Sequence, residues 1–123
     1  LRPGVSLHEY HKEVGELMTA QLLGLGLIDK HDVDKQNPAW PAYKKYFMHG
    51  TSHFIGLDVH DVGLWHEPIQ AGHIFTVEPG IYIQEEGLGI RLENDIVIRE
   101  NGFDDLMGDI PVDAEAIEDA MNS

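Results

Sequence analysis

The residues that could carry chemistry are histidines and glutamates set among apolar residues. They gather in three segments, with His49, His53 and His60 in residues 49–61, Glu78 at the end of an apolar run, and Glu93 in an alternating segment. Imidazole nitrogens and carboxylate oxygens on short strands are the donors that a hard or borderline divalent cation needs. The chain shows no Ser-His-Asp order, phosphate-binding glycine loop or HExxH helix that would indicate a different chemistry.

The two glutamates can also be explained without function. Arg91, Glu93 and Asp95 share one face of the alternating segment, and charges on a half-solvated strand account for that pattern at least as well as a cleft does. In a functional site, Arg91 beside Glu93 would keep the carboxylate ionised and oriented. Glu78 is harder to explain, because an unpaired carboxylate in a buried strand is costly and needs a cation or hydrogen-bond donors.

The three histidines are ambiguous too. A single histidine is usually a satisfied core or surface residue, whereas three in a segment punctuated by Gly50 and Gly56 are harder to explain structurally. Each ring can bind a metal, donate to a substrate or transfer a proton. Strand alternation would place His53 and His60 on opposite faces unless Gly56 permits a bulge, and the sequence leaves that point open.

A long helix must pack against the strands that carry these residues. Ser6 and Glu9 form a capping-box pattern, apolar residues recur at helical spacing to Leu25, and Gly24 and Gly26 mark the end. Residues 29–46 are expected to form a loop with a short helical turn. A final short helix is expected after Asp113, with three apolar side chains facing inward, namely Ala114, Ile117 and Met121.

The sequence predicts three strands. They cover residues 53–60, residues 73–83 with a break at Pro79-Gly80, and residues 88–99, where isoleucines and a leucine alternate with polar residues. Turns are expected at 85–87 and 101–102. The predicted class is α+β, an antiparallel sheet covered by helices.

Composition limits the class of protein. The 123 residues suffice for one domain, and the formal charge of −14, from 22 acidic and 8 basic residues, disfavours nucleic acid and membrane partners. The absence of cysteine excludes disulfides and thiolate metal sites and fits a cytoplasmic location. No apolar run approaches membrane-spanning length, and no signal-peptide pattern opens the chain.

The three segments resemble the C-terminal half of the pita-bread metallopeptidases, specifically the proline-specific Xaa-Pro aminopeptidase and prolidase family. The histidine block at 49–61 matches the proline-peptidase signature at every constrained position, and Thr76–Gly80 and Ile90–Asp95 follow in the family's order and approximate spacing. The resemblance covers nearly the whole chain. It implies that residues 1–123 are a single unit, the C-terminal half of a metallopeptidase catalytic domain, with a curved antiparallel sheet covered by helices.

The resemblance also implies roles for individual residues. His53 and Glu78 would ligate one ion, and Glu93 would bridge two divalent ions, with manganese first and cobalt, zinc or iron as alternatives. Glu78 would also act as general base and acid. His49 and His60 would bind substrate and stabilise the tetrahedral intermediate, and Arg91 would orient Glu93 or an associated carboxylate. The implied reaction is hydrolysis of the bond before proline in Xaa-Pro peptides, which releases the N-terminal residue.

The family's site also uses two aspartates on strands upstream of the helix that begins after Ser6. This chain starts after that point, and Asp29, Asp32 and Asp34 follow the helix instead. We therefore expect partial metal binding, little or no hydrolysis by this chain alone, a partner in the missing N-terminal half of the catalytic domain, and self-association as a homo-oligomer. Three alternatives stay open: an Xaa-Pro dipeptidase, a non-catalytic peptide- or protein-binding module, and a creatinase-like or methionine-specific relative.

Overall fold

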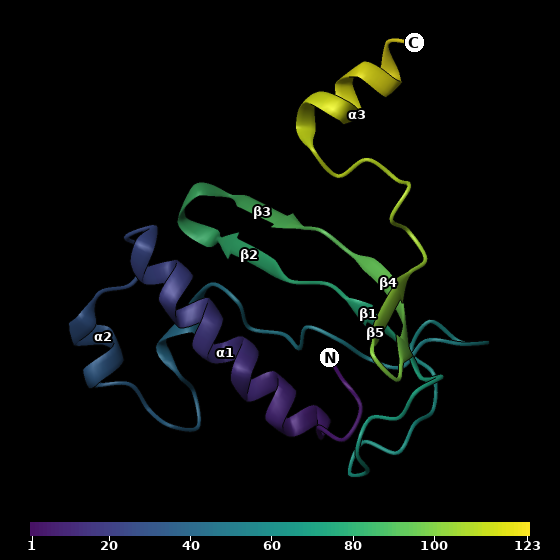
Figure 1. The fold of residues 1–123 in the computed structure, drawn as a ribbon. Helices are drawn as coiled ribbons and strands as arrows, with labels where there is room; N and C mark the ends of the chain where they lie inside the picture. Colours follow the sequence, from purple (N-terminus) through teal and green to yellow (C-terminus); the bar gives the residue numbers. More distant parts are fainter.

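The computed structural model describes residues 1–123, which form three helices and five strands (Figure 1). The helices are α1 (Leu7–Gly24), α2 (Lys30–Asp34) and α3 (Ala114–Met121), and a 3₁₀ turn covers Ala42–Lys45. The strands are β1 (Ile74–Val77), β2 (Gly80–Ile83), β3 (Leu88–Arg91), β4 (Asn94–Arg99) and β5 (Gly102–Asp105), with a 3₁₀ turn at Gln84–Glu86. Helices alongside antiparallel strands confirm the α+β class.

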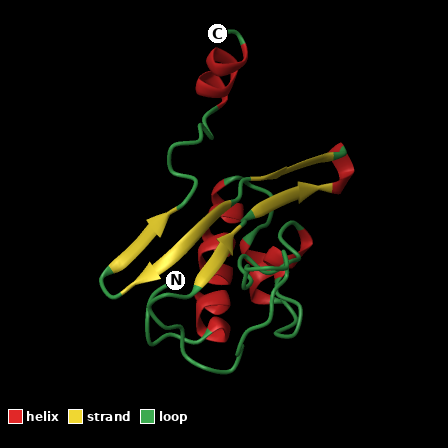
Figure 2. Cartoon of the chain, turned by 90° about the vertical axis from the view of Figure 1, so that its right-hand side faces the viewer, coloured by secondary structure: helices red, strands yellow, loops and turns green.

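Helix α1 begins where its capping residues predict. The Ser6 side chain accepts the Glu9 backbone N–H, and the Glu9 carboxylate accepts the Ser6 N–H, which completes the capping box. The helix lies along the strands and buries Leu7, Tyr10 and Leu22 against them (Figure 2). No helix of the structure is both long and apolar enough to cross a bilayer.

Strands β1 and β2 form one long bent hairpin with β3 and β4. Strand β1 pairs with β4, and β2 pairs with β3, so the order is β1-β4-β5 in one sheet and β2-β3 in the other. Pairing stops after Val77↔Asn94 and resumes at Gly80↔Arg91 in the same register. Pro79 lies at this break and has no N–H to donate to a ladder.

The single strand predicted over 88–99 has the right outer bounds but is two strands in the structure. The break divides it into β3 and β4, whose apolar residues differ in burial. Ile96 and Ile98 of β4 are buried, whereas Ile90 of β3 is 61% exposed. The ladder is interrupted at residues 92–93, and all four residues of β3 are exposed, so its alternation does not mark a core face. Strand β5, which follows the predicted turn at 101–102, was not predicted; all four of its residues are exposed.

The strand predicted over 53–60 is wrong. Only Phe54 makes a bridge, to Phe75 of β1, and residues 56–60 form bends with exposed side chains. The apolar residues of this segment, Leu57 and Val59, lie exposed in a surface loop, so their apolar character does not indicate a buried strand. The preceding residues 51–54 do run beside β1, because the Glu78 N–H donates to the Thr51 carbonyl at 2.8 Å and the Thr76 N–H to the His53 carbonyl at 3.1 Å.

Two clusters form the core. The larger joins α1 to the β1-β4 pair and contains six buried residues, namely Leu7, Tyr10, Ile69, Phe75, Ile96 and Ile98. The smaller contains Leu22, Ile28 and Tyr46. Helix α3 is capped by Asp113 as predicted, but it stands away from the rest of the chain (Figure 1), and Met121 is 81% exposed, so the inward packing predicted for this helix is wrong.

Candidate metal centre

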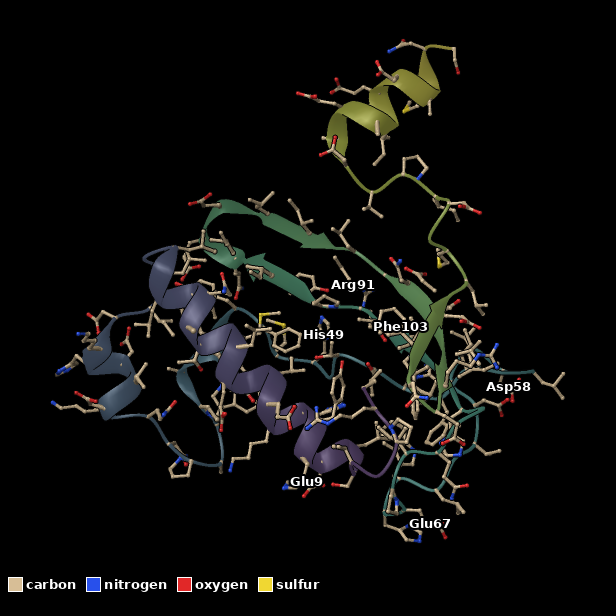
Figure 3. All side chains as sticks on the ribbon, viewed as in Figure 1. Glu9, His49, Asp58, Glu67, Arg91 and Phe103 are labelled. Atoms are coloured by element: carbon tan, nitrogen blue, oxygen red, sulfur yellow. The ribbon has the colours of Figure 1, made fainter.

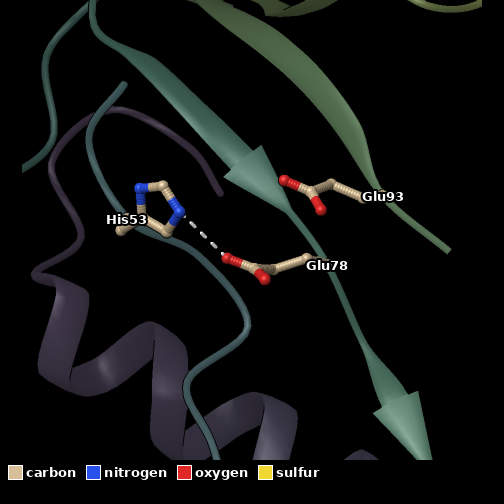
Figure 4. Close-up of side chains that lie close together, drawn as sticks. All are labelled: His53, Glu78 and Glu93. Atoms are coloured by element: carbon tan, nitrogen blue, oxygen red, sulfur yellow. Dashed lines mark ion pairs between the residues drawn. The ribbon is translucent and has the colours of Figure 1, made fainter. Parts of the chain in front are cut away.

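His53, Glu78 and Glu93 come together at the break in the long hairpin. One nitrogen or oxygen atom from each of the three side chains lies within 4.8 Å of the others. The His53 Nε2 atom is 3.1 Å from Glu78 Oε1, and these two side chains are only 12% and 11% exposed (Figure 4). A ring nitrogen and two carboxylates at this spacing form a donor set that fits a borderline divalent cation.

The strand register explains why the two glutamates meet. Because β1-β4 and β2-β3 share one register, Glu78 falls opposite Glu93, one step beyond the Val77↔Asn94 pair. The unpaired step at Pro79 opens the ladder there, so both carboxylates can turn toward the same space (Figure 4). His53 reaches that space from the segment that lies along the other edge of β1.

The ring of His53 is oriented by its other nitrogen. His53 Nδ1 lies 2.8 Å from the Phe54 carbonyl oxygen, and a carbonyl only accepts, so Nδ1 carries a hydrogen. In the neutral ring, Nε2 then presents a lone pair toward the site. Metal-binding histidines commonly donate their second ring N–H to a backbone carbonyl in this way, so the orientation fits a ligand.

Glu78 is held at both oxygens. Thr76 Oγ1 donates to Oε1, and Arg91 Nη1 donates to Oε2, each at 3.1 Å. Arg91 therefore bonds the neighbouring carboxylate of Glu78 and not Glu93, the partner that strand spacing suggested. The resemblance had left both Glu93 and an associated carboxylate open. Arg91 is two residues before Glu93 on the same strand face and therefore lies diagonally across from Glu78.

The other two histidines occupy different positions. The His60 ring stacks on the His53 ring, with centroids 4.0 Å apart and planes 16° apart, so His60 borders the candidate centre. His49 lies elsewhere against Tyr82. Its Nδ1 donates to the Gly50 carbonyl at 2.6 Å, and its Nε2 is 3.0 Å from the Tyr82 hydroxyl (Figure 3 labels His49 and Arg91).

The loop between His53 and His60 folds back so that the two imidazole rings stack. Asp61 accepts the backbone N–H groups of Leu57 and Val62, at 2.8 and 2.7 Å. The Gly56 N–H donates to the Asp58 carbonyl. These bonds fold the chain back on itself, and a Cβ on Gly56 would lie 2.2 Å from the Asp61 carboxylate. The turn, rather than a bulged strand, brings His60 over His53.

Two residues of α1, Tyr10 and His11, contact the histidine segment. The Tyr10 hydroxyl is 3.0 Å from Ser52 Oγ, and burial raises the pKa of this phenol, so it acts as a neutral hydrogen-bonding group. His11 packs against Gly50, where an added Cβ would lie 3.0 Å from the imidazole. Burial lowers the pKa of His11, with smaller contributions from the positive charges of His8 and Lys44.

Two contacts of the site were not predicted. Thr76 could have been identified, since it lies two residues before Glu78 on a strand and shares its face. Tyr82 carried no such signal, because its partner His49 is 33 residues away in sequence.

Comparisons with known proteins agree with this geometry. Residues 1–100 match the profile of Metallopeptidase family M24. The Xaa-Pro aminopeptidase of Escherichia coli (strain K12) is 42% identical over 132 aligned positions, which cover 98% of this chain and 30% of that protein. Xaa-Pro aminopeptidase 3 of Homo sapiens is 35% identical, covering 94% of this chain and 24% of that protein.

The fold is similar to that of a solved relative. Zinc-substituted E. coli aminopeptidase P in complex with product matches with a TM-score of 0.82 and 41% identity, covering 98% of this chain and 30% of that one. This likeness confirms the pita-bread fold. The chain spans about a quarter to a third of the length of the curated relatives it matches. From the match over residues 1–100, the chain belongs to metallopeptidase family M24.

Proposed function

We propose that this chain supplies part of the catalytic site of an Xaa-Pro aminopeptidase, which hydrolyses the peptide bond before proline and releases the N-terminal residue. The observation that carries the proposal is the convergence of His53, Glu78 and Glu93 in a member of family M24. The curated relatives that match nearly the whole chain include Xaa-Pro aminopeptidases, which supports the substrate class.

His53, Glu78 and Glu93 would hold the metal in this proposal. His53, through Nε2, and Glu78 would hold one divalent ion, and Glu93 would help to hold that ion and a second; we propose manganese, with cobalt, zinc and iron as alternatives. When bound, such ions polarise the scissile carbonyl and lower the pKa of an attacking water.

The remaining residues position groups and move protons. Glu78, whose buried carboxylate lies 3.1 Å from His53 Nε2, would accept a proton from the attacking water and return it to the leaving proline nitrogen. Arg91 keeps that carboxylate oriented. The exposed ring of His60 stabilises the developing negative charge on the substrate carbonyl oxygen, and His49 contacts the substrate beside Tyr82.

Three protein ligands are too few to hold two ions firmly. A dinuclear site needs further carboxylates, and the acidic residues of this chain outside the three do not join the cluster. We therefore propose that the 123-residue chain alone binds metal weakly and hydrolyses little. The missing N-terminal half of the catalytic domain would complete the site.

The test uses the full-length protein that contains this chain. With manganese, we expect hydrolysis of Xaa-Pro-containing tripeptides, loss on chelation and recovery when the metal is restored. Glu78→Gln should lower kcat by about 10²–10⁴-fold, the usual contribution of a general acid–base residue. Glu67→Gln, a substitution of an exposed glutamate outside the cluster, is the matched control and should leave kcat unchanged.

Several outcomes of this test separate the alternatives. Turnover restricted to Xaa-Pro dipeptides would assign a prolidase, and turnover of Met-Ala peptides in preference to Xaa-Pro peptides would assign a methionine-specific relative. Peptide binding without hydrolysis at any metal concentration would assign a non-catalytic binding module and refute the proposal.

A further inference from the structure

Thr76 has a hydroxyl group where the strand otherwise carries apolar side chains. It lies in β1 between Phe75 and Val77 and is fully buried, with 0% exposure. A buried hydroxyl without hydrogen bonds is costly, whereas valine would fill the same volume and suits a strand at least as well. The hydroxyl must therefore be satisfied by what surrounds it.

The directions of its two hydrogen bonds are fixed by the partners. The His53 backbone N–H only donates, so Thr76 Oγ1 accepts from it at 3.1 Å. The hydroxyl hydrogen is then free for Glu78 Oε1, also at 3.1 Å. One side chain thus bonds the backbone of one proposed metal ligand and the carboxylate of another.

The Thr76 backbone adds a third bond to the same segment. Its N–H donates to the His53 carbonyl at 3.1 Å, so residues 53 and 76 are joined in both directions. Glu78 lies one residue beyond the end of β1 and two residues after Thr76, so the side chains of both point to the side of His53. This geometry sets the position of the His53 backbone relative to the Glu78 carboxylate.

The second anchor of Glu78 is weaker. Arg91 holds the other carboxylate oxygen, but its side chain is 47% exposed, so solvent competes for this ion pair. Thr76 has no exposure to water, and its bond to the carboxylate is charge-assisted. Of the two, Thr76 determines where Oε1 lies, and Oε1 is the oxygen that faces His53 Nε2.

We propose that Thr76 is a positioning residue that holds His53 and Glu78 at the separation needed to bind a divalent cation together. The inference rests on the proposed function, because it assumes that these two residues are ligands. Removing the hydroxyl should leave the fold in place and loosen the geometry of the pair. Supporting partners of this kind typically change metal affinity by about 10–100-fold when they are mutated.

The test compares Thr76→Val, which keeps the shape, with Thr76→Ser, which keeps the hydroxyl. Manganese affinity is measured by calorimetric titration of the full-length metal-free protein, and the urea midpoint is measured in parallel. Thr76→Val should weaken affinity about 10–100-fold at a similar urea midpoint, whereas Thr76→Ser should bind as the wild type does. If Thr76→Val does not fold, Thr76→Ala takes its place.

A metal-free measurement separates this inference from the proposed function. In the 123-residue chain, amide exchange at His53 should accelerate in Thr76→Val and not in Thr76→Ser, since only the hydroxyl accepts that N–H. Wild-type affinity together with unchanged exchange in Thr76→Val would overturn the inference. If the wild-type protein bound no manganese while the exchange difference was present, the proposed metal site would fail but the positioning of His53 by Thr76 would stand.

Discussion

At the scale of single residues, His11 makes stability depend on pH. Its ring packs against the histidine segment, its Nε2 atom is buried without a hydrogen-bond partner, and burial lowers its pKa below the usual 6.5. The folded chain therefore disfavours the protonated ring, whereas the unfolded chain accepts the proton freely. As the pH falls below about 6.5, the unfolded state binds more protons and the free energy of unfolding decreases.

We predict that His11→Phe removes this part of the pH dependence. The variant keeps a ring against Gly50 and cannot titrate, so its free energy of unfolding should fall less than that of the wild type between neutral pH and about 5.5. Urea titrations at several pH values measure the slope. His31→Gln, a substitution of an exposed histidine on α2, should leave the slope as it is. An unchanged slope in His11→Phe would show that other groups cause the dependence.

Residue types made His53, Glu78 and Glu93 candidates but did not select them, because charges on a half-solvated strand explain Glu93 at least as well. The ligand set came from the resemblance to the proline-specific metallopeptidases. The hydrogen-bond partner of Arg91, Glu78, could not be predicted from the spacing of residues along its own strand. Spacing alone put Arg91 next to Glu93, but the choice of Glu78 depends on a cross-strand diagonal that only the register reveals.

At the scale of elements, β1 links the core to the candidate centre. Phe75 points into the core with 0% exposure and contacts the Phe54 ring at a centroid distance of 4.6 Å, while Thr76 points to the opposite face. The Phe54–Phe75 contact is also the only β-bridge between the histidine segment and β1. Core packing and the position of His53 therefore depend on the same aromatic pair.

We predict that Phe75→Ala lowers the free energy of unfolding by about 3–5 kcal/mol, the usual cost of emptying a buried phenylalanine site. Phe103→Ala in β5 is the matched control, because Phe103 is largely exposed and should change stability by no more than about 0.5 kcal/mol. Urea unfolding followed by circular dichroism measures both. Equal losses in the two variants would mean that the cluster around Phe75 is not the main core.

Specific residues that cap a helix or break a strand predicted their elements correctly, whereas the apolar content of a segment did not. The capping box at Ser6 and the break at Pro79 both act through backbone hydrogen bonds, and both lie where the sequence places them. The apolar composition of residues 53–60 predicted a strand, yet the bonds to Asp61 fold this segment into a loop. A side chain that bonds the backbone within its own loop overrides β-propensity, and no periodicity reveals it.

At the scale of the whole molecule, one face is apolar although the chain is strongly acidic. A groove of about 550 Å³ lies between the end of α1 and the β2-β3 hairpin. Its lining includes Leu25, Leu88, Ile90 and Leu92, each of which is about half exposed or more. Contiguous exposed apolar surface of this kind marks an interaction site.

We predict that the isolated chain self-associates through this groove. The net charge of −14 opposes association, so screening by salt should strengthen it, and the average mass in sedimentation equilibrium should rise with both protein and salt concentration. The double variant Leu25→Glu and Ile90→Glu should shift the chain to monomer, because each carboxylate would have to lose its hydration in the interface. The double variant Val59→Glu and Val62→Glu adds the same two charges at exposed apolar residues outside the groove, and it should weaken association far less. A monomer at every concentration and salt level would show that the exposed groove does not drive contact between copies.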